Sequence, residues 1–383
     1  MTYGLDHKGQ LHQNSFDNTI VNLSNGIRMS KKIEKHNTFH DFSSRYVPLI
    51  NHYIDSFYAH KELSAKNHEL KIAYRLLQEY CTREGKRIRP LLLLLSFAGY
   101  GGLVKKINAM IPVASSLECM HAFLLIQDDI IDGAVVRRGK PAFHILCNSS
   151  YYQYNANIGT WVAIVLADVV MSNALEMIAT LEGSSIKYFL NEFAVMYERT
   201  ALGQLLDIIW SHPEKISDDD IAEMIAAMKT AHYTVSGPLK LGYILAGGND
   251  SDELQRLTEM GYSLGFAFQM RDDIIGVFGD EKDMGKSASS DIAEGKYTVL
   301  VQQAWNKLDE KDRTHCLDLL RKDKKTIGEI DTIKHYITKS GAVTVLQDII
   351  DEHLQKVNAI LPQLQCNDFM KQCMMQFIDG LFQ

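Results

Sequence analysis

The residues with the clearest chemical character are three aspartates and two arginines that follow a long apolar stretch. Asp128, Asp129 and Asp132 are followed closely by the basic pair Arg137 and Arg138. If the apolar stretch is helical, Asp128 and Asp132 lie one turn apart on one face, with Cβ atoms roughly 6 Å apart. Carboxylates at that spacing suit Mg²⁺, which keeps several waters and is usually completed by substrate phosphates. Because guanidinium groups bind phosphate oxygens, this stretch predicts a magnesium and phosphate site.

A second acidic pair repeats the pattern later in the chain. Asp272 and Asp273 close another apolar stretch, and Gln269 precedes them on the same expected helix. Either acidic motif alone is equally well explained as a solvated helix end. Two such ends in one apolar protein indicate function, because an unpaired charge in an apolar interior is costly. We therefore expect the two acidic motifs to face each other across one metal site.

Basic residues gather at helix ends near both acidic motifs. A single lysine or arginine is ordinarily a solvated surface group, and a single histidine on an apolar helix is ordinarily a core residue. Clustering beside acidic motifs favours phosphate binding instead. His121 precedes Asp128 by two helical turns and so shares its face. The basic and polar candidates are Lys86, Arg87, Arg89, His121, Lys229, Thr230 and Lys286.

Nearly the whole chain after residue 45 shows the 3.6-residue apolar period of helices. Alternating β-branched runs bounded by tight turns are nearly absent. The stretches 110–126 and 161–175 are apolar nearly all round and are predicted to be buried. The sequence thus predicts an all-α protein in which residues 41–383 form a single large helical bundle, its two Asp-rich motifs facing a central cavity, and residues 1–40 form a flexible extension. The expected helices lie near 46–57, 70–80, 91–95, 106–132, 160–182, 185–210, 218–246, 251–279, 297–307, 325–339, 342–361 and 366–382.

Composition narrows the class of protein. A formal net charge of −7 over 383 residues argues against a nucleic-acid partner. The six cysteines are dispersed without a CxxC pair, which favours reduced thiols in a cytoplasmic protein over a zinc site or a disulfide scaffold. The N-terminus shows no apolar signal region. Charged residues interrupt the apolar stretches before they reach the ~20 residues that cross a bilayer, so we expect no transmembrane segment.

Taken in order, the motifs resemble those of the trans-isoprenyl diphosphate synthases, or polyprenyl synthetases. The similarity covers about residues 45–300, and its specificity comes from separated motifs that agree in order and spacing. It implies the isoprenoid synthase fold and a homodimer. The motifs are Gly85-Lys86-Arg87-Ile88-Arg89-Pro90, Asp128-Asp129-Ile130-Ile131-Asp132 with Arg137-Arg138-Gly139, Lys229-Thr230, Phe268-Gln269 with Asp272-Asp273, Gly285-Lys286 and Gly295-Lys296.

The resemblance implies a Mg²⁺-dependent condensation of isopentenyl diphosphate with dimethylallyl, geranyl or farnesyl diphosphate. In such enzymes the allylic C–O bond ionises, the isopentenyl double bond attacks the cation, and the released diphosphate takes the proton. Implied contacts with isopentenyl diphosphate come from Lys86, Arg89, His121 and Arg138. Implied contacts with the allylic diphosphate come from Arg137, Lys229, Thr230, Gln269 and Lys286. About three Mg²⁺ ions would be held by Asp128, Asp132 and Asp272, and the catalytic set would add Asp129, Asp273 and Lys229.

Two positions depart from the family pattern. Gly276 stands where the second motif usually has a third aspartate, so a carboxylate of the outer metal shell is missing there. Asp273 or Asp280 could compensate through water. Gln127 replaces a common histidine, and its amide still forms hydrogen bonds. The segment Gly279–Gly295, with glycine and serine around Lys286, is a candidate lid.

Product length is expected to depend on the residues just before the first acidic motif. In this family a bulky side chain four or five residues before Asp128 stops growth of the prenyl chain, and these positions hold Leu124 and Phe123. An aromatic at the fifth position alone resembles enzymes that stop at geranylgeranyl diphosphate. Phe123 could instead be ordinary core packing. Leu166, Val169 and Val170 are expected to form the rest of the apolar surface that limits the length of the prenyl chain.

Three alternatives stay open at this stage. The first is a synthase whose product is farnesyl diphosphate or a longer polyprenyl diphosphate. A catalytically silent subunit of a heteromeric synthase is supported by Gly276 alone. A terpene cyclase shares the bundle and an acidic motif, but it has no use for the isopentenyl set of Lys86, Arg89 and His121.

Overall fold

A computed structural model describes residues 38–102, 106–151, 153–155, 157–183, 185–211, 220–279, 289–322 and 324–382. Helix α2 (Phe39–Ser64) already begins two residues after the last undescribed position, and the Thr38 side chain caps it by accepting a hydrogen bond from the Asp41 amide. The predicted extension therefore lies outside the described residues, apart from its last three positions. The central part of the expected lid, with Lys286, also lies outside them.

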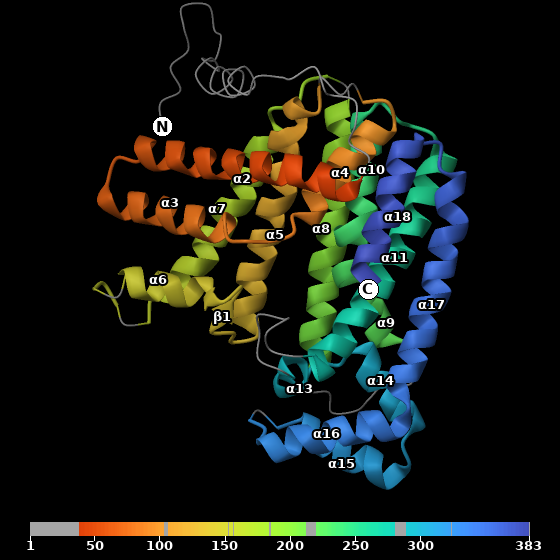
Figure 1. Cartoon of the computed structure of the whole chain (residues 1–383). Coiled ribbons are helices and arrows are strands. Elements are labelled where there is room, and N and C mark those ends of the chain that lie inside the picture. Colours follow the sequence, from red (N-terminus) through yellow and green to blue (C-terminus); the bar gives the residue numbers. More distant parts are fainter. Residues whose placement is uncertain are drawn as a thin grey trace, which may run out of the picture.

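Long helices run side by side through most of the molecule, and α15 and α16 lie at one end (Figure 1). The described helices are α2 (Phe39–Ser64), α3 (His68–Cys81), α4 (Ile88–Gly99), α5 (Ile111–Ile131), α6 (Phe143–Tyr151), α7 (Gly159–Ile178), α8 (Ser185–Trp210), α9 (Ile221–Ala226), α10 (Gly237–Leu245), α11 (Ser251–Phe278), α13 (Ser290–Glu294), α14 (Val299–Lys307), α15 (Glu310–Leu320), α16 (Ile327–Ser340), α17 (Ala342–Ile360) and α18 (Asp368–Phe382), with the 3-10 turns η2 (Asn108–Met110) and η4 (Leu361–Gln363) and the π-helix η3 (Ala227–Ser236). The prediction of an all-α protein is confirmed.

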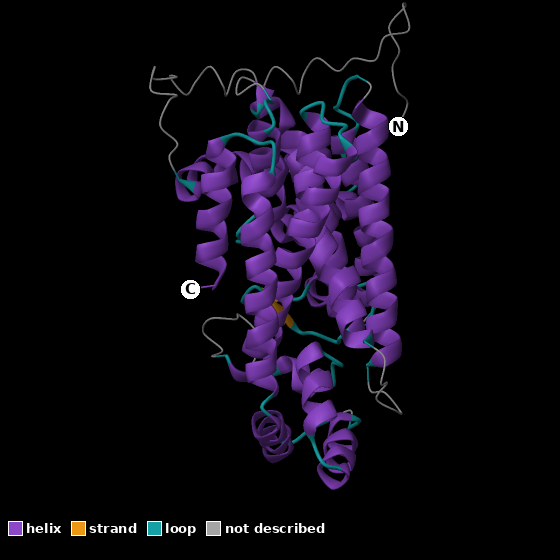
Figure 2. Cartoon of the chain, turned by 90° about the vertical axis from the view of Figure 1, so that its right-hand side faces the viewer, coloured by secondary structure: helices purple, strands orange, loops and turns teal. Residues whose placement is uncertain are grey.

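Strand pairing among the described residues is confined to one hairpin (Figure 2). Strands β1 (Val136–Arg137) and β2 (Lys140–Pro141) are antiparallel, with Arg137 opposite Lys140. Gly139 takes a left-handed φ of 70° in the turn, a conformation that glycine adopts without steric cost. The hairpin directly follows α5, so it returns the basic residues of the first motif towards the acidic end of that helix.

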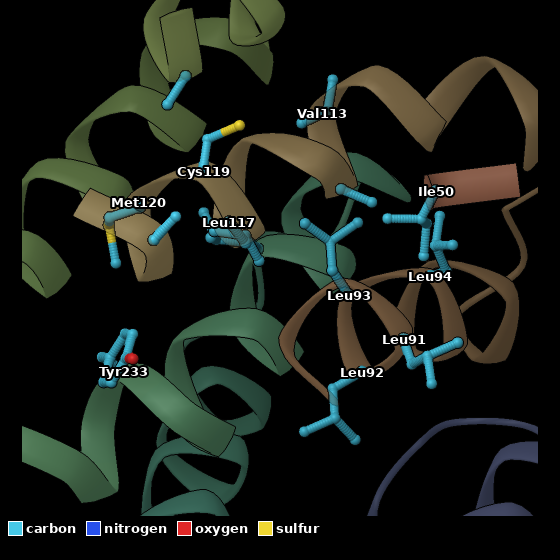
Figure 3. Close-up of a cluster of buried hydrophobic side chains, with 14 of the residues drawn as sticks. Ile50, Leu91, Leu92, Leu93, Leu94, Val113, Leu117, Cys119, Met120 and Tyr233 are labelled. Carbon is cyan, nitrogen blue, oxygen red and sulfur yellow. The ribbon is translucent and has the colours of Figure 1, made fainter. Parts of the chain in front are cut away.

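Helices α4 and α5 form the centre of the core. Leu91 to Leu95 of α4 are all buried and belong to the same apolar cluster as Val113, Leu117 and Met120 of α5, and Figure 3 shows most of them. Each fully buried leucine side chain contributes about 1.5–3 kcal/mol relative to its exposed state. This apolar packing fixes the axis of α5, and the first acidic motif lies at the carboxyl end of that helix.

The expectation that 161–175 is buried all round is wrong. Helix α7 packs on α5 and α6 but leaves large apolar side chains exposed, among them Trp161 at 60% and Val165 at 61%. The outer face of α7 is exposed in the described structure. The apolar composition of this helix was therefore not evidence of a central position. By length and apolar composition, the stretches Asn108–Ile131 and Gly159–Ile178 would both be long enough to cross a membrane, and 72% of an apolar 18-residue window in the first is buried inside the protein.

Other details of the helix pattern also differ from the prediction. The expected helix 218–246 is divided into α9, η3 and α10, and helices α6 and α15 were not predicted. Helix α15 is largely polar, so its apolar period is weak. All six cysteines are buried and free.

Helix α10 approaches α4 closely because Gly242 has no side chain. A Cβ at Gly242 would lie 2.7 Å from Ser96 Cβ and 2.8 Å from the backbone nitrogen of Phe97. Neither of these atoms belongs to a flexible side-chain end, so the two helices would have to separate.

We predict that Gly242→Ala lowers the free energy of unfolding by about 1–3 kcal/mol, because the added methyl group overfills this contact. Gly380→Ala is the matched control, since Gly380 is exposed on α18 with no atom within 4 Å of its Cβ position. That control should be neutral or stabilising by up to about 1 kcal/mol. Urea denaturation measures both, and equal stability of the two variants would contradict the close contact.

Candidate active site

Two aspartates at the carboxyl end of α5 each lie against a lysine. Lys229 Nζ lies 3.0 Å from Asp128 Oδ1, and Lys296 Nζ lies 2.8 Å from Asp132 Oδ2. Burial alone would raise the pKa of Asp128, but the charges of Lys229, Lys296 and Arg137 outweigh burial and lower that pKa. Asp128 is therefore ionised. The end of α5 presents the oxygen ligands that Mg²⁺ prefers.

Lys229 is shared between Asp128 and Asp207, an acid of α8 that the sequence analysis missed. Its Nζ lies 2.7 Å from Asp207 Oδ2. Gly203 permits the approach, because a Cβ there would lie 2.5 Å from the backbone nitrogen of Lys229. Burial disfavours the charged ammonium, but the two carboxylates raise the pKa of Lys229 overall. In the sequence, Asp207 could have been noticed as one acid within the otherwise apolar run 205–209.

The hairpin brings Arg137 back onto the first acidic motif. Arg137 Nε lies 2.7 Å from Asp129 Oδ1, and its Nη2 lies 3.5 Å from Asp128 Oδ2. Asp129 is fully buried, and the Tyr80 hydroxyl lies 3.4 Å from its second oxygen. Asp129 thus holds the hairpin arginine, whereas Asp128 and Asp132 face the lysines.

Glu118 of α5 joins the two basic motifs. It forms a buried ion pair with Arg87 and lies 3.6 Å from Arg138 Nη2. Arg87 also donates hydrogen bonds to Asn51 Oδ1 at 2.7 Å and to the Arg83 carbonyl at 2.7 Å. Arg87 and Arg138 both take a left-handed φ, 50° and 55°, which costs about 1–3 kcal/mol each and is sustained by these contacts. Arg87 therefore fixes the turn before α4.

Arg89 and His121 meet at Tyr233, another residue that the sequence analysis missed. The Arg89 guanidinium carbon lies 4.0 Å from the centre of the Tyr233 ring, and Arg89 Nη2 donates a hydrogen bond to Thr234 Oγ1 at 3.0 Å. The Tyr233 hydroxyl lies 2.5 Å from His121 Nδ1. Burial and then the neighbouring arginines lower the pKa of His121 well below its usual value, so the imidazole is neutral at pH 7. Lys86 is exposed at the entrance to α4.

The second acidic motif separates into one exposed and one buried acid. Asp272 is exposed, whereas Asp273 is buried and accepts a hydrogen bond from Gln269 Nε2 at 2.7 Å. Burial, with the nearby Asp291 and Asp272 carboxylates, raises the pKa of Asp273 well above its usual value. Thr230 is half-buried beside Lys229 on η3.

The carboxylate donors lie on two separate helices. In the described ranges, no group of three or more acidic, histidine or cysteine side chains is close enough to hold a metal ion by itself. Mg²⁺ commonly binds one or two carboxylates and completes its shell with water and phosphate oxygens. The all-oxygen set of Asp128, Asp132 and Asp272 therefore fits Mg²⁺ together with a phosphate-bearing molecule.

The wall before the acidic motif is apolar and aromatic. Phe123 is buried, and its ring meets that of Tyr197 on α8 edge to face with centroids 5.7 Å apart. Leu124 is half-buried beside the same core. Leu166, Val169 and Val170 of α7 belong to the same apolar cluster.

The structure thus joins many of the predicted residues through direct contacts. Asp128 contacts Lys229 and Arg137, and His121 is linked to Arg89 through Tyr233. Lys296, quoted only as a family motif, contacts Asp132. Lys286 lies outside the described residues.

Comparisons with known proteins identify the family of this chain. The family model described as polyprenyl synthetase matches residues 70–337. A short chain isoprenyl diphosphate synthase from Methanothermobacter thermautotrophicus is 32% identical over 77% of this chain and 85% of its own length. A geranylfarnesyl diphosphate synthase from Aeropyrum pernix is 32% identical over 74% of this chain and 85% of its own length. A crystal structure of geranylgeranyl pyrophosphate synthase from Corynebacterium glutamicum, complexed with isoprenyl diphosphate and magnesium, has a TM-score of 0.79 at 28% identity and covers 88% of this chain and 97% of its own. The chain therefore belongs to the polyprenyl synthetase family of prenyltransferases.

Proposed function

We propose that this chain condenses isopentenyl diphosphate with allylic diphosphates and that its main product is geranylgeranyl diphosphate. The observation that carries the proposal is the charge arrangement at the end of α5. Asp128 and Asp132 lie there beside Lys229, Lys296 and Arg137. This combination of acids for Mg²⁺ and cations for phosphate suits a reaction in which diphosphate is the leaving group.

The allylic diphosphate is assigned to Lys229, Arg137, Thr230, Gln269 and Lys286. Lys229 is held by Asp128 and Asp207, so its ammonium is oriented before any substrate binds. Arg137 is oriented in the same way by Asp129. Cations that are already in place stabilise the charge of the departing diphosphate without reorganising during the reaction.

The isopentenyl diphosphate is assigned to Lys86, Arg89, His121 and Arg138. Arg89 Nε is buried and has no hydrogen-bond partner among the described residues, although Nη2 of the same side chain is bonded to Thr234. Buried polar groups are usually satisfied, so an unpaired guanidinium nitrogen favours an anionic ligand at this position. A cyclase would have no use for this second diphosphate site.

Mg²⁺ is assigned to Asp128, Asp132 and Asp272, with about three ions as in the family. When bound, Mg²⁺ neutralises the diphosphate charge and so favours cleavage of the allylic C–O bond. The buried Asp129 and Asp273 orient Arg137 and Gln269 and act through them. A cytoplasmic location is retained as a prediction.

We further propose that two copies of the chain pair through α7 and α8. Helix α7 ends at Ile178 and α8 begins at Ser185, and both helices carry exposed apolar side chains. An uncovered apolar face of this extent is unusual for a monomer and fits a second copy of the same surface. The exposed apolar residues on these helices are Trp161, Ile164, Val165, Leu175, Tyr188, Leu190, Leu202, Leu205, Ile208 and Ile209.

Activity tests the assignment directly. The purified chain, incubated with isopentenyl diphosphate, farnesyl diphosphate and Mg²⁺, should form geranylgeranyl diphosphate, and chelation of Mg²⁺ should abolish the product. Asp128→Asn should lower kcat by about 10²–10³, since a lost carboxylate weakens charge stabilisation in the transition state. Asp331→Asn, an exposed acid on α16, is the control and should leave kcat unchanged. Absence of elongation by the wild-type chain would contradict the proposal and revive the silent-subunit alternative.

The length of the product tests whether Phe123 limits growth of the prenyl chain. Phe123→Ala should shift the product beyond geranylgeranyl diphosphate, because removing the ring opens space between α5 and α8. Phe57→Ala is the matched control, since it removes a similarly buried ring from α2, where loss of stability should leave product length unchanged. Chromatography of the dephosphorylated alcohols measures both. An unaltered product from Phe123→Ala would show that Phe123 is core packing alone.

Sedimentation tests the pairing. The wild-type chain should sediment as a dimer, and Val165→Lys should shift it towards monomer because a charge is then buried in the interface. Ile327→Lys, which changes an 80% exposed residue on α16, should remain dimeric. A wild-type monomer would refute the pairing. Binding to lipid vesicles through the same face would identify a membrane as the occupant instead.

A further inference from the structure

The second acidic motif lacks a carboxylate at Gly276, but another carboxylate fills the space beside that glycine. A Cβ placed on Gly276 would lie 3.0 Å from Asp291 Cγ and in contact with Asp291 Oδ2. Asp291 belongs to α13, fifteen positions later in the chain by residue number. Any side chain at position 276 would therefore compete with Asp291 for one volume.

The position of Asp291 is fixed from both ends of α13. The Ser289 hydroxyl is buried and lies 3.4 Å from the Val277 carbonyl of α11. Ile292 is fully buried in the same apolar cluster as Val277. Gly295 then ends the turn with a left-handed φ of 73°. These contacts hold α13 against α11, so Asp291 is held over Gly276.

Asp291 also lies next to the lysine that reaches the first acidic motif. The Lys296 backbone amide donates a hydrogen bond to the Asp291 carbonyl at 2.9 Å, and Lys296 Nζ pairs with Asp132 at 2.8 Å. Figure 1 shows α13 at the same end of the bundle as the β1 hairpin, which follows the first motif. The segment from Asp291 to Lys296 thus contacts α11 at Gly276 and the first acidic motif at Asp132.

We infer that Asp291 supplies the carboxylate that position 276 lacks and so completes the metal-binding acids of the second motif. This inference rests on the proposed function, because it assigns Asp291 to the Mg²⁺ and diphosphate of that site. It also resolves the departure at Gly276: the motif keeps its third carboxylate, which comes from another element. A purely local role for Asp291, in the first turn of α13, is the competing explanation.

Moving the acid from position 291 to position 276 distinguishes these two explanations. Mn²⁺, which like Mg²⁺ prefers oxygen ligands, is the probe, and its binding is measured by electron paramagnetic resonance with inorganic pyrophosphate present. Asp291→Asn should weaken Mn²⁺ binding about ten- to hundredfold, the usual effect of removing a carboxylate that supports a metal site. The double variant Gly276→Asp/Asp291→Ala should recover affinity to within about threefold of wild type. A role confined to α13 could not be restored from position 276.

Asp331→Asn serves as the control for a generic loss of negative charge and should bind Mn²⁺ as the wild type does. Thermal unfolding of each variant establishes that it is folded. Unchanged Mn²⁺ binding by Asp291→Asn would overturn the inference, as would a folded double variant that binds as weakly as the single one, or a wild-type chain without pyrophosphate-dependent Mn²⁺ binding. Failure of the proposed function alone has a different signature: normal Mn²⁺ binding without chain elongation from isopentenyl diphosphate.

Discussion

The structure depends on keeping the Asp128 carboxylate ionised at the end of an apolar helix. Its side chain is mostly buried, and burial alone would favour the neutral form. Lys229 and Lys296, with Arg137, reverse that preference by lowering the pKa of Asp128, and each lysine comes from a distant part of the chain. Chain segments around residues 130, 229 and 296 must therefore converge on one point. This electrostatic requirement links the tertiary fold to the chemistry more directly than any single helix does.

Helix η3 serves both ends of the site. Lys229 near its beginning contacts Asp128, and Tyr233 one turn later contacts His121, which lies two turns earlier on α5. The segment thus runs beside α5 and reaches both predicted diphosphate sites. A displacement of η3 would move Lys229 of the predicted allylic site and Tyr233 of the predicted isopentenyl site together. The close approach at Gly203 holds the segment against α8 and limits such displacement.

Much of this arrangement could be predicted from the sequence, because the motifs carry their own spacing. The i, i+4 acids and the Lys229-Thr230 pair are local patterns, and so is the helical period. Asp207 and Tyr233 could not be found in this way, since their importance lies in which residues the fold places beside them. The exposed face of α7 was missed for a related reason: apolar composition does not tell a covered helix from one with an exposed face.

The acids within one motif have different tasks, and burial separates them. Asp129 and Asp273 are buried and bonded to Arg137 and Gln269, whereas Asp272 is exposed and Asp128 keeps 17% of its side chain accessible. A buried acid that fixes a substrate-binding side chain removes the entropy cost of ordering that side chain on binding. Two adjacent aspartates on a helix point in different directions, so one pair supplies both a ligand and a support. Adjacent acids at a helix end therefore do more than raise the local negative charge, because one of them builds the site that the other uses.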